Sequence, residues 1–311
     1  MAFDMDLRQL RYFLGIAETG SISAASQRLR VAQPALSQQL ARLEAELGAP
    51  LMLRSSRGVT LTAAGEALKT HAERLLREAE RAREAVRAEI AGPIRGRVAI
   101  GLPTTVAMLL TLPLLRALRA EHPALALHLA ESQSGHLQEW LRQGRIDLAI
   151  LFDQEGAPPG LGLRPLVEEE LYLAGTGGEG AEITLAEALR LPVLLPGREH
   201  GFRRLLEAHA ARAGGAWQVV AEVDALPHLK AGVAAGLAHT VLPWAALGAE
   251  IAAGTLRARR IVAPVLRRTA VLACAGERPA SRGQQAAEAC LLALVRRLVD
   301  EGAWRGRLLL A

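Results

Sequence analysis

Residues 20–48 read GSISAASQRLRVAQPALSQQLARLEAELG, and this stretch decides the fold of the N-terminal part of the chain. Ser23 is placed to cap a short helix that runs through Leu29, because a serine hydroxyl can accept from a first-turn N–H. Pro34 falls in the first turn of a longer helix, where a missing N–H costs nothing, and Gly48 is placed to end that helix. The stretch therefore predicts two helices joined by a tight turn.

A further amphipathic helix precedes these two. Asp6 and Gln9 have the spacing of a capping box, and Gly20 is placed to end the helix. Apolar residues recur at helical spacing in this helix and in the longest of the three, so both can bury one face in a shared core. These residues are Leu7, Leu10, Leu14 and Ala17, then Leu36, Leu40, Leu43 and Leu47.

The opposite face of the third helix carries small polar groups. Amide side chains can bond adenine edges in the major groove of DNA, and a serine hydroxyl can donate or accept there. An ordinary solvated helix face is the alternative interpretation. Together with Ser23, the candidate DNA contacts on this face are Gln33, Pro34, Ser37, Gln38 and Arg42.

Two short strand patterns follow the third helix. Residues 51–54 and 59–61 are rich in apolar residues, and the turn-forming sequence Ser55–Gly58 joins them. Arg54 and Arg57 make this hairpin basic, so it can contact phosphate or the minor groove. Residues 1–62 are therefore predicted to form a winged helix-turn-helix DNA-binding domain.

A long helix begins after Thr62, and Gly92-Pro93 breaks it, which makes residues 63–93 a linker helix and hinge. Its apolar residues recur at near-heptad spacing and favour pairing with a second copy of the helix. Packing of this stripe on its own domain is the alternative. The candidate dimerisation residues are Leu68, Leu75, Ala79, Ala82 and Val86.

The N-terminal residues resemble the signature of the LysR-type transcriptional regulators. The likeness rests on Ala24-Ala25, on the run from Ala32 to Ser37, on Leu47-Gly48 and on the run from Leu61 to Gly65. It implies a homodimer or homotetramer on a partly palindromic double-stranded DNA operator, with RNA polymerase as a candidate partner. Met52 stands where the family often has Phe. Ala32 stands where a Ser often caps the recognition helix, so that cap is expected to be weak.

From Gly96 onward strand and helix patterns alternate, which predicts an α/β domain with a parallel sheet covered on both faces. The order and spacing, with the run from Gly144 to Ile150, are similar to the effector domain of LysR-type regulators, which resembles periplasmic binding proteins in its two lobes. The predicted effector domain spans residues 94–311, with lobe I at 94–165 and 268–303 and lobe II at 166–267. The predicted fold class is thus α+β in the N-terminal part and α/β in the C-terminal part. The run from Gly96 to Gly101 looks like the nitrogen-assimilation-control subgroup.

Small-molecule ligands of such domains lie beyond the carboxyl ends of the strands, where helix N-termini present free N–H groups. The turn after residues 98–102 holds Thr104 and Thr105, and in the family the matching turn often contributes to the effector site. Two helix N-termini and Arg198 favour an anionic effector, whereas Asp153 argues against one. The alternatives are that the threonines only cap a helix, and that a regulator without an effector is controlled by its abundance, the C-terminal domain serving only oligomerisation. The candidate effector residues are Thr104, Thr105, Phe152, Asp153, Pro196, Arg198 and Phe202.

Composition and charge exclude several other classes of protein. Half of the residues are apolar, which disfavours disorder, and no apolar run is long enough for a membrane helix, so a cytoplasmic protein is expected. The net charge of +5 does not mark the DNA-binding part, because residues 257–311 hold 11 Lys/Arg against 4 Asp/Glu and residues 1–91 hold 13 against 11. Cys274 and Cys290 have no metal-type spacing and are expected to be reduced.

No pattern for an enzyme is found in the chain. Residues 175–180 fit the glycine spacing of a dinucleotide-binding loop, but the next helical pattern begins only after Thr184, so a plain loop is expected. No nucleophile elbow or metal-binding helix is found, and no catalytic residue, metal or cofactor is predicted. An enzyme domain fused to a DNA anchor remains the alternative from another class.

Overall fold

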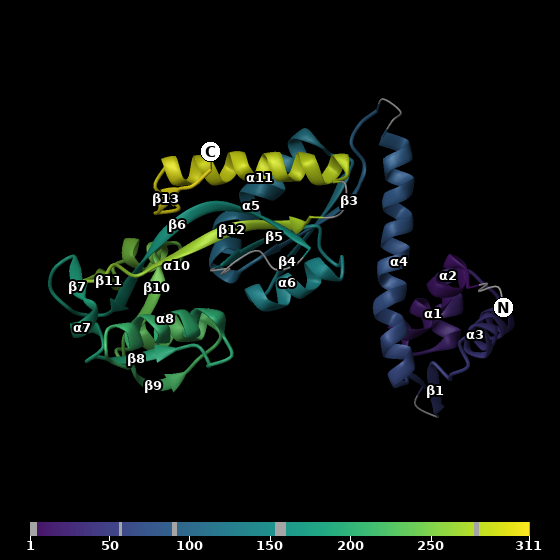
Figure 1. Cartoon of the computed structure of the whole chain (residues 1–311), viewed down its shortest axis with the longest axis horizontal. Coiled ribbons are helices and arrows are strands. Elements are labelled where there is room, and N and C mark those ends of the chain that lie inside the picture. Colours follow the sequence, from purple (N-terminus) through teal and green to yellow (C-terminus); the bar gives the residue numbers. More distant parts are fainter. Residues whose placement is uncertain (1–4, 56–57, 89–91, 153–159, 277–279, 311) are drawn as a thin grey trace. The chain divides into compact units, whose positions relative to one another are not determined.

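The computed structural model describes residues 5–55, 58–88, 92–152, 160–276 and 280–310. Arg57 and Asp153, two of the predicted site residues, lie outside these ranges. The chain divides into two compact units, Met1–Ala91 with Gln143–Arg145, and Gly92–Arg142 with Ile146–Ala311 (Figure 1). Each unit is described by itself.

The first unit contains four helices and one hairpin within its described residues. The capping box of Asp6 and Gln9 is confirmed, and so are the helix ends at Gly20 and Gly48, which both adopt the left-handed conformation. The second helix differs from its prediction: Ser21, not Ser23, accepts the N–H of Ala24. The elements are α1 (Leu7–Thr19), α2 (Ile22–Leu29), α3 (Gln33–Leu47), β1 (Met52–Ser55), β2 (Gly58–Leu61) and α4 (Ala63–Ala88).

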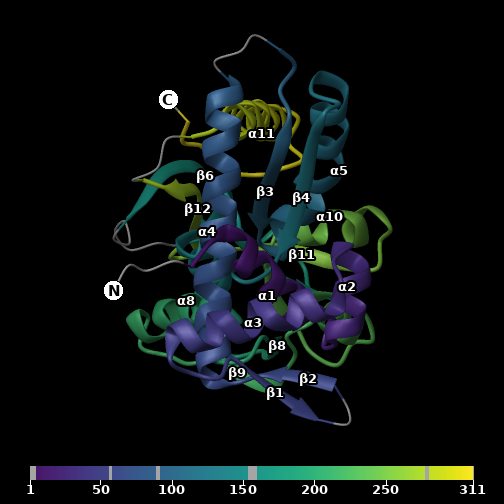
Figure 2. The ribbon, with the colours of Figure 1, turned by 90° about the vertical axis from the view of Figure 1, so that its right-hand side faces the viewer.

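The three short helices share one core. Phe13, Leu36 and Leu43 are fully buried there, and Ala72 brings the first half of α4 into the same cluster. In Figure 2 the β1–β2 hairpin extends as a two-stranded arm of this unit. Gly58 joins the arm to α1 at a φ of +124°, where a Cβ would lie 2.6 Å from the carbonyl oxygen of Gly20. Only glycine therefore allows the Val59 N–H to reach that carbonyl at 2.8 Å.

The second unit is built on a sheet in the order β4-β3-β5-β12-β6-β11-β7, with β10 and β13 also paired to β6. Strands β8 and β9 form a separate parallel pair. The strands are β3 (Gly96–Leu102), β4 (Leu125–Glu131), β5 (Leu148–Phe152), β6 (Leu161–Gly175), β7 (Glu182–Thr184), β8 (Pro192–Leu195), β9 (Gln218–Glu222), β10 (Thr240–Pro243), β11 (Arg257–Val262), β12 (Arg267–Ala275) and β13 (Arg307–Leu308). The helices are α5 (Thr104–Glu121), α6 (Ser134–Arg142), α7 (Leu185–Ala188), α8 (Gly201–Arg212), α9 (Leu226–Ala234), α10 (Trp244–Ala252) and α11 (Arg282–Asp300).

The prediction of a purely parallel sheet is wrong. Strands β4, β3 and β5 are parallel, but β12 runs antiparallel to both β5 and β6. The reason is that the chain re-enters this sheet through β12 after building the second lobe, and so arrives from the opposite direction. The sequence also predicted strand only at 172–174 within β6, and it did not predict α10 or β11.

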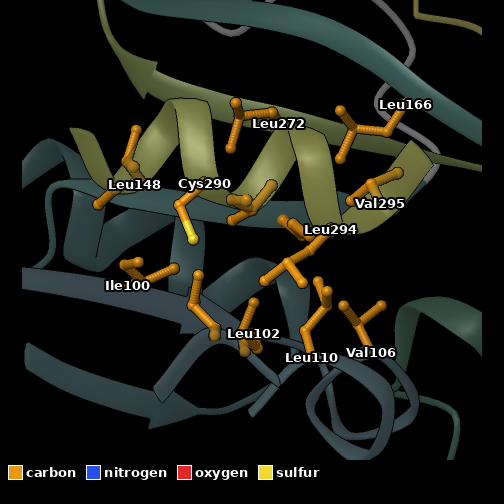
Figure 3. Close-up of a cluster of buried hydrophobic side chains, with 14 of the residues drawn as sticks. Ile100, Leu102, Val106, Leu110, Leu148, Leu166, Leu272, Cys290, Leu294 and Val295 are labelled. Atoms are coloured by element: carbon orange, nitrogen blue, oxygen red, sulfur yellow. The ribbon is translucent and has the colours of Figure 1, made fainter. Parts of the chain in front are cut away.

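Two lobes are visible as separate clusters of buried side chains. In lobe I, helices α5 and α11 pack against one face of the sheet around Ile100, Leu110 and Leu294 (Figure 3), and α6 covers the other face (Figure 1). In lobe II, one cluster forms around Leu173 and Leu206, and another joins α9 to α10. Strands β6 and β12 run from lobe I into lobe II and are called the crossover strands below.

Candidate DNA-binding surface and ligand site

The polar face of α3 is open to solvent. Gln33, Pro34, Gln38 and Arg42 are exposed and Ser37 is half-buried, whereas Leu36, Leu40 and Leu43 on the other face are buried. Ser23, on α2, is also exposed. The predicted DNA contacts thus lie on the exposed face of α3, and the buried opposite face packs into the core of the first unit.

The turn before α3 is held by its backbone conformation and a backbone hydrogen bond rather than by a capping side chain. Arg30 adopts the left-handed conformation, and the Val31 N–H donates to the carbonyl of Ser26 at 3.0 Å. The expected weakness of the cap is confirmed, because Ala32 is the N-cap residue of α3 and, among the described residues, no side chain caps the first-turn N–H groups of α3. These N–H groups carry partial positive charge that favours an anion such as a DNA phosphate.

The wing is held to the recognition helix by one carboxylate. Glu44 on α3 accepts the N–H groups of Leu51 and Met52 at 2.8 and 3.2 Å, just before and at the start of β1. Arg54 on β1 is exposed. The wing arginine therefore keeps a fixed position relative to the polar face of α3.

The stripe predicted on α4 divides into two parts. Leu68 packs against the core of the winged unit, as do Leu76 and the fully buried Ala72. Leu75 is 41% exposed and Val86 70% exposed. Ala79 is half-buried and Ala82 is exposed. The apolar surface left uncovered by the first unit is thus centred on Leu75 and Val86.

In the second unit, Arg268 brings together several residues from the predicted effector site. Its Nη2 donates to the hydroxyl of Thr105 at 2.9 Å, and its guanidinium lies 3.6 Å from the ring centre of Phe152 and 5.0 Å from that of Phe202. Thr105 and Phe152 belong to lobe I, and Phe202 belongs to lobe II. We call Arg268 with Thr105, Phe152, Phe202 and Glu169 the Arg268 cluster.

Glu169 balances the charge of Arg268. The two side chains are 2% and 6% exposed, and Nε of Arg268 donates to the Glu169 carboxylate at 2.5 Å. The second carboxylate oxygen accepts the indole N–H of Trp304 at 2.8 Å. Burying a charge is costly unless it is paired and hydrogen-bonded, and here both carboxylate oxygens are satisfied. The guanidinium is thereby held in place between the cores of the two lobes.

The other predicted effector residues have different surroundings. Thr104 donates to Glu131 at 2.7 Å, and the carbonyl of Pro196 accepts from the buried Arg203 at 3.1 Å. Arg198 is exposed, and no contact of it with the Arg268 cluster is observed among the described residues. The predicted loop at 175–180 is confirmed, because α7 begins only at Leu185 behind the capping box of Thr184 and Glu187.

His200 caps α8 beside this cluster. Its Nδ1 accepts the N–H of Phe202 at 3.1 Å, which places the proton of the neutral ring on Nε2. Burial lowers the pKa of His200, and the charges of Arg268 and Arg204 lower it further, while Asp224 opposes the shift. His200 is therefore a neutral hydrogen-bond donor near neutral pH.

Sequence reasoning missed Arg268, Glu169 and Trp304. A signal for the first two was present, because the sequence holds an acidic run, Glu168–Glu170, and a basic pair, Arg267-Arg268. The two members of the ion pair, Glu169 and Arg268, are 99 positions apart in the chain. An acidic run in one strand and a basic pair in another are suited to directly opposed positions on neighbouring antiparallel strands, where opposite charges attract. Trp304 gave no comparable signal.

These features define the class of protein: a winged helix-turn-helix that presents an exposed polar helix face, followed by a two-lobed α/β domain with a buried arginine between the lobe cores. The family described as "Bacterial regulatory helix-turn-helix protein, lysR family" matches residues 7–66. The family described as "LysR substrate binding domain" matches residues 91–298. The chain belongs to the LysR family of DNA-binding transcriptional regulators, as the resemblance implied.

Relatives of known name agree with this assignment. The nitrogen assimilation regulatory protein nac of Klebsiella aerogenes is 37% identical over 296 residues, covering 94% of this chain and 96% of its own. The nac protein of Escherichia coli K12 is 37% identical over 245 residues, covering 78% and 79%. The chain thus resembles the nitrogen-assimilation-control subgroup, and these relatives are regulators rather than enzymes.

Solved structures show the same architecture over nearly the whole chain. A full-length variant of OxyR from Pseudomonas aeruginosa has a TM-score of 0.72 at 28% identity, covering 95% of this chain and 96% of that one. Full-length CbnR in complex with its target DNA has a TM-score of 0.70 at 27% identity, covering 94% and 99%. No helix among the described residues is long and apolar enough to cross a membrane.

Proposed function

We propose that this regulator binds a small anionic effector at the Arg268 cluster and that the effector changes its action at a DNA operator. The observation that carries the proposal is the contact of Arg268 with side chains from both lobes. A ligand seated there would touch lobe I through Thr105 and Phe152 and lobe II through Phe202. Such a ligand can favour one arrangement of the lobes over another, which is what a change in activity requires.

The chemistry of the cluster supports an anion. The N-terminus of α5 has no side-chain cap, and Val106 and Ala107 donate to the carbonyl of Pro103, so the N–H groups of Thr104 and Thr105 are the ones that could bind an anion. Arg268 presents five donors, of which the structure pairs Nε with Glu169 and Nη2 with Thr105. Nε2–H of His200 adds a neutral donor on the side of lobe II. A carboxylate or an inorganic anion matches this set of donors.

The test is a thermal-shift screen of small carboxylates and inorganic anions against the full-length protein. A ligand present at about 100 times its dissociation constant stabilises the bound domain by about 2.7 kcal/mol. We expect Thr105→Val to weaken this stabilisation by removing a hydroxyl at the site. Thr104→Val is the matched control, because the Thr104 hydroxyl is directed to Glu131 instead. The stabilising ligand should also change the footprint on the operator.

If no compound stabilises the protein, regulation by abundance becomes the better interpretation. If Thr104→Val and Thr105→Val have equal effects, the effector does not lie at the Arg268 cluster.

The exposed part of the α4 stripe supports a second proposal, that α4 pairs with α4 of a second copy to form at least a homodimer. Leu75→Asp or Val86→Asp would place an unpaired charge in that pairing, at a high cost in free energy. We expect a lower mass by light scattering and loss of binding to a palindromic operator, with Thr70→Asp on an exposed position as the control. An unchanged mass in both variants would show that α4 does not pair. Tetramer formation and contact with RNA polymerase stay predictions.

A further inference from the structure

The crossover strands have a second face, on the side opposite the Arg268 cluster. Directly opposed residues of antiparallel strands lie on the same face, and neighbours along a strand lie on opposite faces. Arg268 is opposite Glu169, and Arg267 is opposite Glu170. Glu168, Glu170 and Arg267 therefore point away from the Arg268 cluster.

This outer face contains a cavity of about 660 Å³. That volume lies within the range of about 300–1,000 Å³ that is usual for small-molecule sites. Its lining is mostly polar, and three chain segments contribute to it. The side chains used below are the carboxylates of Glu168 and Glu170, the hydroxyl of Tyr172, and the guanidinium groups of Arg267, Arg305 and Arg307.

The segment after α11 forms one wall of the cavity. Trp304 is buried, and β13 pairs Arg307 with Glu168, so the chain lies directly against β6. Gly306 makes this approach possible, because a Cβ there would lie 2.6 Å from the carbonyl oxygen of Glu168. Arg305 and Arg307, which follow the last helix of lobe I, therefore lie beside the crossover strands. The basic surplus of residues 257–311 is thus partly concentrated at this cavity.

The charges of the cavity are only partly paired with one another. Arg267 lies 3.8 Å from Glu168 and 3.6 Å from Glu170, and Arg307 lies 3.3 Å from Glu168. Arg260, which is not part of the lining, also donates to both carboxylate oxygens of Glu170 at 3.3 Å, so a ligand ammonium group would share Glu170 with it. Arg305 is different: within the part of the chain that the structure describes, its guanidinium forms no ion pair and lies 3.3 Å from the ring centre of Trp244. Stacking on Trp leaves the edge of the guanidinium, apart from the donor that meets the Tyr172 hydroxyl, to bind a planar acceptor.

Tyr172 reflects this mixed environment. Burial raises the pKa of Tyr172 and the charge of Glu170 raises it further, while Arg305 lowers it through its charge and a hydrogen bond. The hydroxyl therefore stays protonated and can act as a donor between the acidic and the basic side of the cavity.

We propose that this cavity binds a small zwitterion that carries a carboxylate and an ammonium group, of which free α-amino acids are the simplest. The carboxylate would be bound by Arg305 and the ammonium group by Glu170 and Glu168. A simple anion would meet two carboxylates, and a simple cation would meet three guanidinium groups. Only a ligand with both charges is complementary to both sides of the cavity.

Isothermal titration of the full-length protein with the twenty protein amino acids tests the proposal. Each amino acid that binds is then compared with its α-hydroxy acid, which lacks the ammonium group, and with its amide, which lacks the carboxylate. We expect both analogues to bind about tenfold more weakly or worse, as the loss of a charged hydrogen bond implies. The proposal is overturned if no amino acid binds, or if the hydroxy acid binds as tightly as its amino acid.

Substitutions of the lining residues test whether the amino acid binds in this cavity. Arg305→Met keeps an extended side chain on Trp244 but removes the charge, and we expect about a tenfold or greater loss of affinity. Glu170→Gln should weaken binding as well. Arg296→Met, at an exposed position of α11, is the matched control and should bind as the wild type does.

Thr105→Val separates this proposal from the one above. It should leave amino-acid binding at the outer cavity unchanged. If Thr105→Val abolishes binding and Arg305→Met does not, the amino acid binds at the Arg268 cluster and the outer cavity is not a site. A failure of small anions to bind at the Arg268 cluster would leave the outer cavity unaffected.

Discussion

The recognition helix and the Arg268 cluster differ in how far apart their residues are in the chain. The candidate DNA contacts on α3 lie within one helix, between Gln33 and Arg42. The Arg268 cluster joins Arg268 to Thr105 over 163 positions and to Glu169 over 99. A helix face is set by local periodicity, whereas a buried ion pair depends on strand register. The two regions should therefore respond differently to substitution.

The largest effect is expected for Arg268→Met. This change leaves the Glu169 carboxylate buried without its counter-charge, and the loss of such a partner costs about 3–5 kcal/mol. The free energy of unfolding of the second unit, measured by urea titration, should fall by that order. The double variant Glu169→Gln with Arg268→Met should lose much less, because no charge remains buried.

Arg267→Met is the control for this comparison. Arg267 is adjacent but its side chain is 50% exposed, so a loss of no more than about 1 kcal/mol is expected for its ion pairs. Equal losses in the single and double variants at position 268 would mean that packing on Phe152, rather than charge pairing, stabilises the cluster.

A smaller but more specific effect is expected at the recognition helix. A good bidentate contact to a base is worth about 1–3 kcal/mol of discrimination, so Gln33→Ala with Ser37→Ala should reduce operator selectivity by roughly tenfold or more. The melting temperature should hardly change, because neither side chain belongs to the core. Competition binding with operator and unrelated DNA measures this selectivity. Selectivity equal to the wild type would exclude this face of α3 as the base-reading surface.

The wing should affect affinity without affecting selectivity. Arg54→Ala removes one charge from an exposed strand. If Arg54 contacts a phosphate, the slope of log affinity against log salt concentration should become shallower by about 0.9, for operator and unrelated DNA alike. A loss confined to the operator would instead indicate that Arg54 contacts a base.

The smallest effect is a pH dependence confined to the second unit. Burial lowers the pKa values of His200, His209 and His239 in the folded protein. The unfolded chain therefore takes up protons at a higher pH than the folded protein does. The free energy of unfolding should fall as the pH drops from about 6.5 towards the lower pKa values of the folded protein. His200→Asn retains an oxygen that can cap α8, and should make the melting temperature less dependent on pH between about 7.5 and 5. An unchanged dependence would show that His200 does not contribute to it.

Sequence and structure agree best where local rules suffice. Asp6 with Gln9, Gly20 and Gly48 set the bounds of α1 and α3 as predicted, because caps and left-handed glycines act within one turn of helix. The prediction at Ser23 was wrong by two residues. The run Ser21–Ser23 offers two serines, and Ser21 is the one whose hydroxyl accepts the N–H of Ala24.

The sequence by itself determined the class of this protein, since the order of helices and hairpin in residues 6–62 is specified by capping, turn and apolar patterns that act locally. It also identified Thr105, Phe152 and Phe202 as residues of one candidate site. Only the tertiary structure decided that Arg268 connects them, that the sheet is mixed, and that Glu168 and Glu170 line a cavity on the face opposite the buried Glu169. The physical reason is that strand direction and register assign alternate residues to opposite faces, and both depend on partners far away in the chain.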